Sequence, residues 1–239
     1  QRNIKLTKPF YISLQEVTNL QYRQFAKQHS SGHVNGNSLN SDNYPAVRVS
    51  WQQAALYCNW LSQQHNLAPF YVVENGQITG FSADSVGYRL PLESEWAWLS
   101  RFHNKPNTKY AWGDGLPPNA IAGNIADRSG APILGQIQAQ YDDKFIVSAP
   151  VGSFQVDENG LFDLSGNVAE WVHDYYEIKT GLSLTAERDP VGPAEGQFHV
   201  IRGTSWRHGS MTELRQAFRD YGDSGRDDVG FRVARFVEK

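Results

Sequence analysis

The sequence predicts a single loop-rich α+β domain. A chain of 239 residues with 40% hydrophobic residues is long enough for one substantial core and fits one large domain better than two. Helical and strand-like patterns are short, and the 21 glycines and 11 prolines are spread along the chain instead of gathered in a linker. No internal repeat or low-complexity tract stands out. We therefore expect residues 1–239 to fold as one unit.

The first expected elements are a strand, a helix and a long loop. Phe10-Tyr-Ile-Ser13 has strand character, and Thr18 is a suitable N-cap for a helix that continues to about His29. This helix should turn Tyr22, Phe25 and Ala26 inward. Residues 30–44 are rich in Ser, Asn and Gly without periodicity, which is typical of a long surface loop.

A second helix is expected to start at Ser50. The apolar side chains of the following residues recur at i, i+3, i+4 and i+7, as on one helix face; they are Trp51, Ala54, Ala55, Cys58 and Leu61. Cys58 is the single cysteine, so an intrachain disulfide and a multi-cysteine metal site are excluded. We expect a buried, unreactive thiol there, since free cysteine behaves as a small hydrophobe.

A hairpin and a third helix follow. Asn75-Gly76 lies between the strand-like runs 70–74 and 77–81, and supplies the positive φ angles of a type I′ turn. The third helix should run from about Glu93 to Phe102 with Trp96 and Leu99 inside. After Lys105 the chain is expected to form loops and short strands, with residues 180–197 as another long excursion.

The charge balance excludes some classes of partner. The chain has 22 Lys and Arg against 25 Asp and Glu, a net charge of -3, and no Lys/Arg-rich run. Such a chain has no field that would gather phosphate backbones, so nucleic acid is not expected as a partner. Its apolar stretches are also too short for a membrane span, so we expect no direct membrane insertion of this domain.

Several segments, in order along nearly the whole chain, resemble the formylglycine-generating-enzyme (sulfatase-modifying-factor) family. They include Gly160-Leu-Phe-Asp-Leu-Ser-Gly-Asn-Val-Ala-Glu-Trp171, Arg202-Gly-Thr-Ser-Trp206 and Val229-Gly-Phe-Arg-Val-Ala234, together with residues 16–22, 45–51, 57–61, 89–96 and 111–114. The resemblance implies a compact variant of the C-type-lectin fold, with few helices packed on short twisted sheets. Where the family has Thr as the cap of the third helix, this chain has Leu92, so that helix needs another partner such as Ser94.

The resemblance also implies calcium, at one or two sites. The first set combines the side chains of Asp163 and Glu170 with the carbonyls of Gly166 and Val168. The second combines Asn124 and the Ile125 carbonyl with Asp143 and the Phe145 carbonyl. Hard cations take such mixtures of carboxylate and carbonyl oxygen. The alternative is that these side chains only cap turns or face solvent.

The family's own reaction is not expected. Its enzymes oxidise a substrate cysteine with a copper ion held by two thiolates, and this chain has His208 and Glu213 where relatives carry that pair. We therefore expect no copper and no formylglycine formation. A metal-dependent oxidase with non-haem iron or copper on His208, His173 and Glu213 is the alternative enzyme. His173 could equally be an ordinary packed or surface imidazole beside Trp171 and Tyr175.

A binding or scaffolding module is the function that we favour, with a protein, a peptide or another domain of the same polypeptide as the partner. The expected ligand contacts follow the Arg202–Trp206 motif; they are Trp206, Arg207, His208, Arg219, Tyr221 and Arg226. The alternative is that Trp206 belongs to the core and that the arginines pair with nearby aspartates; these are Asp220, Asp223, Asp227 and Asp228. The triplets of calcium-dependent lectins are absent, so the fold alone does not imply sugar binding.

A last resemblance concerns the setting of the domain. Residues 1–11, 141–145 and 199–203 are most similar to bacterial proteins that place this domain after PEGA domains in an exported or membrane-attached chain. We therefore expect a fragment of a longer chain that works outside the cytoplasm, in the periplasm or at the envelope.

Overall fold

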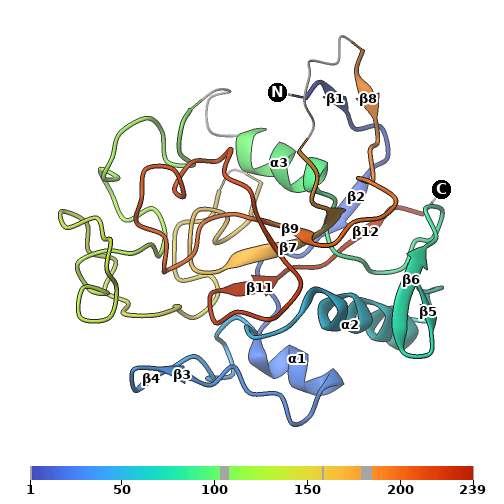
Figure 1. Ribbon diagram of the computed structural model, residues 1–239, viewed down its shortest axis with the longest axis horizontal. Coiled ribbons are helices and arrows are strands. Elements are labelled where there is room, and N and C mark those ends of the chain that lie inside the picture. The colour runs from blue at the N-terminus through green and yellow to red at the C-terminus, as the bar shows by residue number, and fades with distance from the viewer. Residues whose placement is uncertain (1, 103–107, 158, 179–184, 239) are drawn as a thin grey trace.

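The computed structural model describes residues 2–102, 108–157, 159–178 and 185–238. The described chain is an α+β fold with few helices and many short strands (Figure 1). The helices are α1 (Asn19–Phe25), α2 (Trp51–Gln64) and α3 (Glu93–Phe102). The strands are β1 (Ile4–Lys5), β2 (Phe10–Ile12), β3 (His33–Val34), β4 (Asn37–Ser38), β5 (Tyr71–Glu74), β6 (Gln77–Phe81), β7 (Ala169–Tyr175), β8 (Glu187–Arg188), β9 (His199–Arg202), β10 (Asp220–Gly222), β11 (Val229–Phe231) and β12 (Ala234–Phe236).

A central sheet in the order β10-β9-β7-β11 organises the molecule. β9 is antiparallel to both of its neighbours, whereas β11 is parallel to β7. Trp171 on β7 faces Ile201 on β9 in the register, and the pairing shifts before Tyr175. Four two-strand pairs surround this sheet: β1 with β8, β2 with β12, β3 with β4 and β5 with β6.

Both faces of the central sheet are covered, because successive side chains of β7 point to opposite sides. Trp171 packs in one cluster with α2 and β11, whereas Val172 packs in another with Trp96 and Leu99 of α3. Figure 1 shows α3 on one side of the sheet and α1 and α2 on the other. All of β7 up to Asp174 is buried as a result.

The first two helices begin where the sequence predicts. Thr18 and Ser50 each cap a helix through a capping box, in which the residue three positions on returns a side-chain bond. α1 is shorter than expected, since it ends at Phe25 and not near His29. Cys58 is completely buried on the inner face of α2, as predicted, and burial raises the pKa of its thiol.

α3 starts without the cap that we expected from Ser94, whose hydroxyl instead donates to the Pro190 carbonyl at 3.4 Å. The carboxylate of Asp174, from β7, accepts the Glu93 N–H at 2.7 Å. Glu95 accepts the Leu92 N–H at 2.8 Å. The start of this helix is therefore held by one local bond, from Leu92 to Glu95, and by one tertiary contact, to Asp174.

Two hairpins use the same turn. The predicted β5–β6 hairpin has Asn75 at φ 51° and Gly76 at φ 78°, as a type I′ turn requires. Within the expected 30–44 loop, β3 and β4 form a second hairpin with Asn35 at φ 46° and Gly36 at φ 81°. The expected surface loop therefore contains a short hairpin, which Asn35-Gly36 could have indicated.

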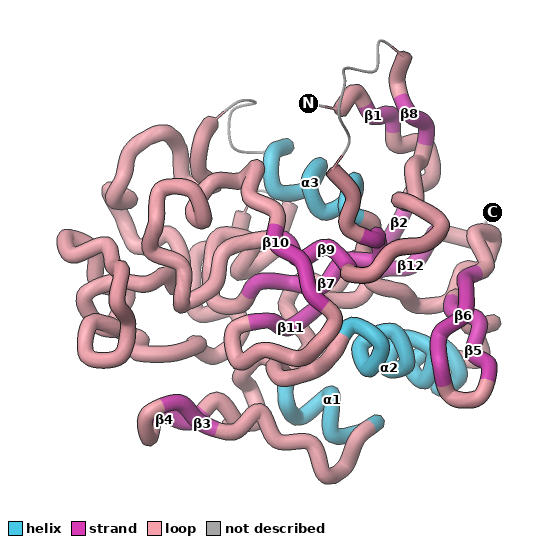
Figure 2. The backbone as a smooth tube through the Cα atoms, in the orientation of Figure 1, coloured by secondary structure: helices cyan, strands magenta, loops and turns pink. Residues whose placement is uncertain are grey.

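Loops make up most of the rest, as predicted. The described residues between α3 and β7 contain no helix or regular strand, only isolated bridges (Figure 2). The 180–197 excursion lies partly outside the described residues, and its described part contributes β8 beside β1. No helix of the described chain is long and apolar enough to cross a membrane.

Candidate functional site

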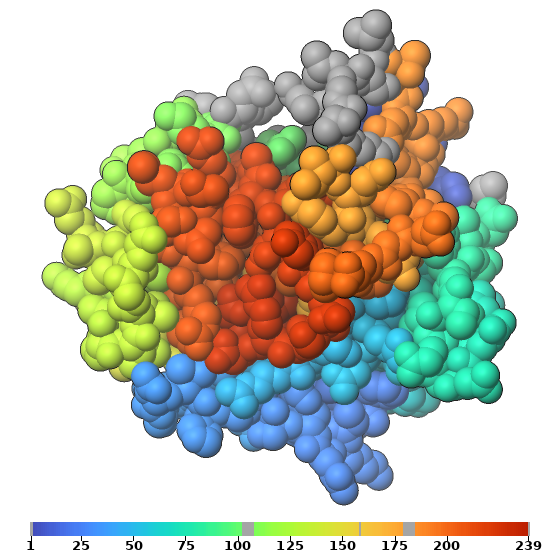
Figure 3. Space-filling view, viewed as in Figure 1, coloured from blue at the N-terminus to red at the C-terminus, as the bar shows by residue number. Residues whose placement is uncertain are grey.

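A cavity of about 910 Å³ lies where three parts of the chain meet. Its wall is formed by Arg48, by residues 133–136 and by C-terminal residues, which are Arg207, His208, Glu213 and 225–228. On the face shown in Figure 3, the C-terminal segment in red borders the yellow-green segment and the blue N-terminal segment. Six of the residues singled out in the sequence line this cavity; they are Arg207, His208, Glu213 and Arg226, with Asp227 and Asp228 from the set of possible arginine partners.

The backbone at the edge of this cavity is unusual. Arg48 has a φ of 59°, a left-handed conformation that side-chain-bearing residues rarely adopt. Its N–H donates to the Arg226 carbonyl at 2.7 Å. A Cβ atom at Gly225 would lie 2.4 Å from the Arg48 carbonyl carbon, so only glycine permits this approach.

Trp206 anchors the segment that leads into the cavity. Its side chain is buried among Leu39, Val47 and Val168, so it belongs to the core and not to the cavity wall. The guanidinium of Arg207 stacks over this indole, 4.4 Å from the ring centroid. Two bonds of 2.8 Å from the same guanidinium hold both oxygens of Asp227. Arg207 is therefore held in one orientation by contacts within the protein.

His208 is a nearly buried imidazole fixed by its neighbours. Its Nδ1 accepts the Ser205 N–H at 3.1 Å, and its Nε2 lies 3.9 Å from a carboxylate oxygen of Asp228. Burial lowers the pKa of His208, while the charges of Asp228 and Glu213 oppose the shift. The ring is thus held as a neutral donor at Nε2 near neutral pH.

Glu213 closes a capping box with Ser210. Its carboxylate accepts the Ser210 N–H at 3.0 Å, and the Ser210 hydroxyl accepts the Glu213 N–H at 3.2 Å. Glu213, at the second position where the resemblance places a cysteine, therefore stabilises the turn of residues 210–213.

The structure does not bring the suggested iron ligands together. His173 lies in the core, with Phe81 and Phe70 edge-on to its ring, and does not line the cavity of His208 and Glu213. Within the described ranges, no three His, Cys, Asp or Glu side chains cluster closely enough to hold a metal ion. With Cys58 alone in the sequence, a two-thiolate copper site is not possible either.

Part of the Asn124–Phe145 set comes together around the Asp143 carboxylate. Asp143 accepts the N–H groups of Ile125 at 3.0 Å and Phe145 at 2.8 Å, so these residues converge on one carboxylate. The amide nitrogen of Asn124 donates to Val147, whereas its buried Oδ1 has no partner. Burial raises the pKa of Asp143 to about 7, which reflects a carboxylate without a counter-charge.

In the Asp163–Glu170 set, the Glu170 carboxylate is already bonded within the protein. The guanidinium of Arg232 holds the Glu170 carboxylate at 2.7 Å, and both side chains are buried. Trp96 Nε1 donates to the same carboxylate at 2.9 Å. Asp163 accepts the Gly152 N–H at 2.7 Å through one oxygen, and its other oxygen is buried without a partner.

The remaining two ligand candidates lie elsewhere. Arg219 donates two hydrogen bonds, of 2.6 and 3.0 Å, to the carboxylate of Glu93 on α3 and lines a separate cavity. Tyr221 is half-exposed on β10, against Tyr176 and Phe198. The structure therefore divides the six predicted ligand residues between two cavities, the core and an aromatic patch.

The sequence did not single out two acidic residues, Asp127 and Glu16, that lie beside the two proposed calcium sets. Asp127 accepts the Asp143 N–H, and Glu16 lies against Asp163 with one buried oxygen that has no partner. Burial and the charge of Asp163 raise the pKa of Glu16. Both acids lie in mixed polar sequence, residues 13–19 and 124–130, so no pattern in the sequence indicates that they are buried.

Comparison with known proteins adds the context for this geometry. A model of the Sulfatase-modifying factor enzyme 1-like domain matches residues 1–237. The formylglycine-generating enzyme of Streptomyces coelicolor is 30% identical over 196 residues, which are 80% of this chain and 52% of that protein. The inactive C-alpha-formylglycine-generating enzyme 2 of Mus musculus is 29% identical over 200 residues, 80% of this chain and 48% of that protein. The chain thus spans about half the length of these curated relatives.

A solved structure supports the fold. Treponema denticola variable protein 1 superimposes with a TM-score of 0.78 at 23% identity, over 98% of this chain and 86% of that chain. Such a match shows that the two proteins share this fold over nearly the full length of the chain. It also shows that the fold accommodates a very different sequence.

Proposed function

Because the chain belongs to the sulfatase-modifying factor enzyme 1-like domain family, we propose that it is a non-catalytic recognition module whose cavity after Trp206 binds a peptide or protein segment. The observation that carries this proposal is the chemistry at the two positions where the resemblance places a cysteine pair. There the chain has a fixed imidazole at His208 and a turn-capping carboxylate at Glu213, on the wall of an open cavity. The family itself includes an inactive relative.

The charge pattern of the cavity favours a polar segment as the ligand. Three basic side chains, Arg48, Arg207 and Arg226, line it together with three acidic ones, Glu213, Asp227 and Asp228. This balance suits a peptide that offers both donors and acceptors better than a strongly charged ligand. Arg207, stacked on Trp206 and fixed by Asp227, is the preorganised anchor.

The backbone strain at Arg48 supports the same location. Left-handed conformations of non-glycine residues cost on the order of 1–3 kcal/mol and cluster at functional sites. Here the strained residue lines the cavity and is braced by the N–H bond to Arg226 and by Gly225.

The first test of this proposal is enzymatic. The purified domain is incubated with a cysteine-containing sulfatase peptide, Cu(I) and oxygen, with the Streptomyces coelicolor relative as the positive control. Mass spectrometry should detect formylglycine only with the relative, because two thiolates are needed to select Cu(I). Formylglycine produced by this chain would overturn the non-catalytic assignment.

The second test measures recognition. Peptides selected from a phage-displayed library on the domain are titrated against wild type, Arg207→Ala and Arg128→Ala. Both variants remove a guanidinium paired with one aspartate, but Arg128 lies outside the cavity. We expect Arg207→Ala to weaken binding about tenfold or more, with Arg128→Ala unchanged. Equal affinities of all three proteins would place the binding site elsewhere.

We also propose calcium as a structural ion, first at the Asn124–Phe145 set. The buried, unpartnered Asn124 oxygen and the uncompensated Asp143 carboxylate fit a hard cation. At the Asp163–Glu170 set, Arg232 already neutralises Glu170, so an ion there would depend on Asp163 and the two carbonyls. A place outside the cytoplasm, which cell fractionation of the native protein can test, would supply millimolar calcium to modest sites.

A further inference from the structure

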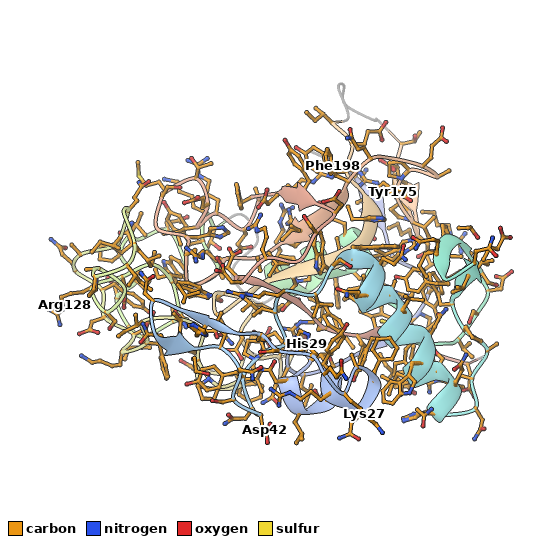
Figure 4. The ribbon with its side chains drawn as sticks, turned by 60° about the horizontal axis from the view of Figure 1, so that its bottom comes forward. Lys27, His29, Asp42, Arg128, Tyr175 and Phe198 are labelled. Carbon is orange, nitrogen blue, oxygen red and sulfur yellow. The ribbon has the colours of Figure 1, made fainter. Side chains whose placement is uncertain are left out.

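A second cavity, of about 640 Å³, lies between α3, the end of β7 and the segment 215–219. It shares no lining residue with the cavity of His208. One wall is a face of α3, because Glu93, Ala97 and Arg101 are spaced four residues apart and fall on one side of the helix. Tyr175 of β7, labelled in Figure 4, forms part of another wall.

The lining of this cavity is strongly basic. Three acidic residues line it, Glu93, Asp174 and Glu177, against twice that number of basic ones. The basic residues are Arg2, Arg101, Lys109, Arg202, Arg215 and Arg219. The chain as a whole has a net charge of -3, so the positive charge of this cavity is a local feature and not a property of the whole molecule.

Arg202 is the buried member of the set. Its terminal nitrogens donate to the carbonyls of Phe218 at 2.7 Å and Gln216 at 2.9 Å, while its buried Nε–H has no partner. The nearest carboxylate, Glu93, is 3.7 Å away and is already gripped by Arg219. Burial, with repulsion from Arg101 and Arg219, lowers the pKa of Arg202 to about 10. The guanidinium also lies 5.1 Å from the centre of the Trp96 ring. Its buried positive charge is thus compensated only in part, and a nearby anion would stabilise it.

The acidic residues do not balance the basic ones. Glu93 is shared between Arg219 and Arg202, and burial raises the pKa of Asp174 to about 7. Arg2 is paired with Glu187, outside the cavity. The side chains of Arg101, Lys109 and Arg215 are exposed, and none forms an ion pair with any residue that the structure describes.

We propose that this cavity binds a small organic anion, whose carboxylate or phosphate oxygens lie between α3 and the segment 215–219. Guanidinium groups match both kinds of oxyanion through paired N–H donors. The buried charge of Arg202 favours an anion at the inner end, and Arg101 and Arg215 add donors nearer the solvent. This inference does not depend on the peptide-binding function, because the two cavities are separate.

The test is isothermal titration of the domain with inorganic phosphate and, separately, with succinate, at constant ionic strength held by sodium chloride. The titrations contain no added calcium, because phosphate precipitates it. Wild type is compared with Arg101→Gln/Arg215→Gln and with a control, Lys27→Gln/Arg128→Gln. The control removes the same charge from exposed positions, which Figure 4 shows far from Tyr175.

We expect at least one probe to bind wild type and the control equally, and to bind Arg101→Gln/Arg215→Gln at least about tenfold more weakly. Binding of phosphate alone would identify a phosphorylated ligand, and binding of succinate alone a polycarboxylate. The inference is overturned if wild type binds neither probe, if Arg101→Gln/Arg215→Gln binds as wild type does, or if the control weakens equally. Coincident melting curves without ligand verify that the variants are folded.

Discussion

Two buried carboxylates of this molecule are each held by a guanidinium group through paired hydrogen bonds. Arg89 holds Glu95 of α3 at 2.6 Å, and Arg232 holds Glu170 of β7 at 2.7 Å, with all four side chains almost inaccessible. Such pairs are expensive to break, because the partner left behind is a buried, uncompensated charge. Asp174 differs from these acids, since no guanidinium bonds its carboxylate and its bond to the Glu93 N–H is its direct stabilising contact.

That difference predicts a stabilising substitution, Asp174→Asn. Burial raises the folded-state pKa of Asp174 from 3.8 to about 7. A carboxyl with a raised pKa stabilises the fold while protonated, below about pH 4, and loses that contribution as the pH rises through 7. Asparagine keeps an oxygen for the Glu93 N–H without the charge. We expect the free energy of unfolding to rise by roughly 1–3 kcal/mol at pH 8, with a gain that shrinks toward pH 4.

Urea unfolding at both pH values measures this effect. Glu177→Gln is the matched control, since Glu177 lines the same cavity but is exposed. It should leave the pH dependence of stability unchanged. An Asp174→Asn variant less stable than wild type at pH 8 would show that the ionised carboxylate is a needed cap for α3.

At the scale of single residues, the sequence predicted that arginines pair with acidic side chains, but not which acid each arginine contacts. The alternative that Trp206 is core and that arginines pair with aspartates is what the structure shows for Trp206, Arg207 and Arg226. Which aspartate pairs with which arginine depends on the loop path, as Arg207 and Asp227 show, 20 residues apart. Arg219 pairs instead with Glu93 of α3, 126 residues away in the sequence.

Among the elements, local signals predicted best. The caps at Thr18 and Ser50 and the turn at Asn75-Gly76 are set by neighbouring residues, so they could be read directly. The start of α3 could not, because its cap is an Asp174 carboxylate 81 residues later in the chain. The β3–β4 hairpin was missed for a different reason, since polar composition outweighed its Asn35-Gly36 turn.

The capping box of α2 gives the prediction at this scale. Ser50→Ala removes the hydroxyl that accepts the Gln53 N–H at 3.2 Å and should cost about 1 kcal/mol. For a domain of this size, the melting temperature should fall by about 2–4 °C. Calorimetry of Ser50→Ala beside Gln63→Ala, an exposed substitution in the last turn of the same helix, checks it. Equal melting temperatures would mean that packing of Trp51 and Cys58 alone fixes the helix start.

For the whole molecule, the question is what holds the long loops between α3 and β7. Those described residues lack regular elements, and a small cluster of Tyr110, Ile125, Tyr141 and Leu214 is one of the few apolar anchors among them. Asn124 and Asp143 lie beside this cluster in sequence and join two stretches of the loop region through Ile125. Asn124 also contacts the segment just before β7, since its carbonyl accepts the Asn167 N–H at 2.8 Å. An ion bound here would tie the loops to the central sheet.

Calcium removal should therefore lower the stability of the whole domain. A site filled at about a hundred times its Kd adds roughly 2.7 kcal/mol, which is about 5–10 °C in melting temperature for a domain of this size. Melting curves with calcium and with a chelator measure the shift, and magnesium, which needs stricter octahedral geometry, tests its selectivity. Asp143→Asn preserves the shape of the side chain but removes the charge, so the calcium-dependent shift should shrink in that variant. A shift that persists in Asp143→Asn and disappears in Asp163→Asn would move the ion to the Asp163–Glu170 set, despite the Arg232 charge there. Coincident curves for wild type with and without calcium would mean that hydrogen bonds such as those of Asp143 hold the loops unaided.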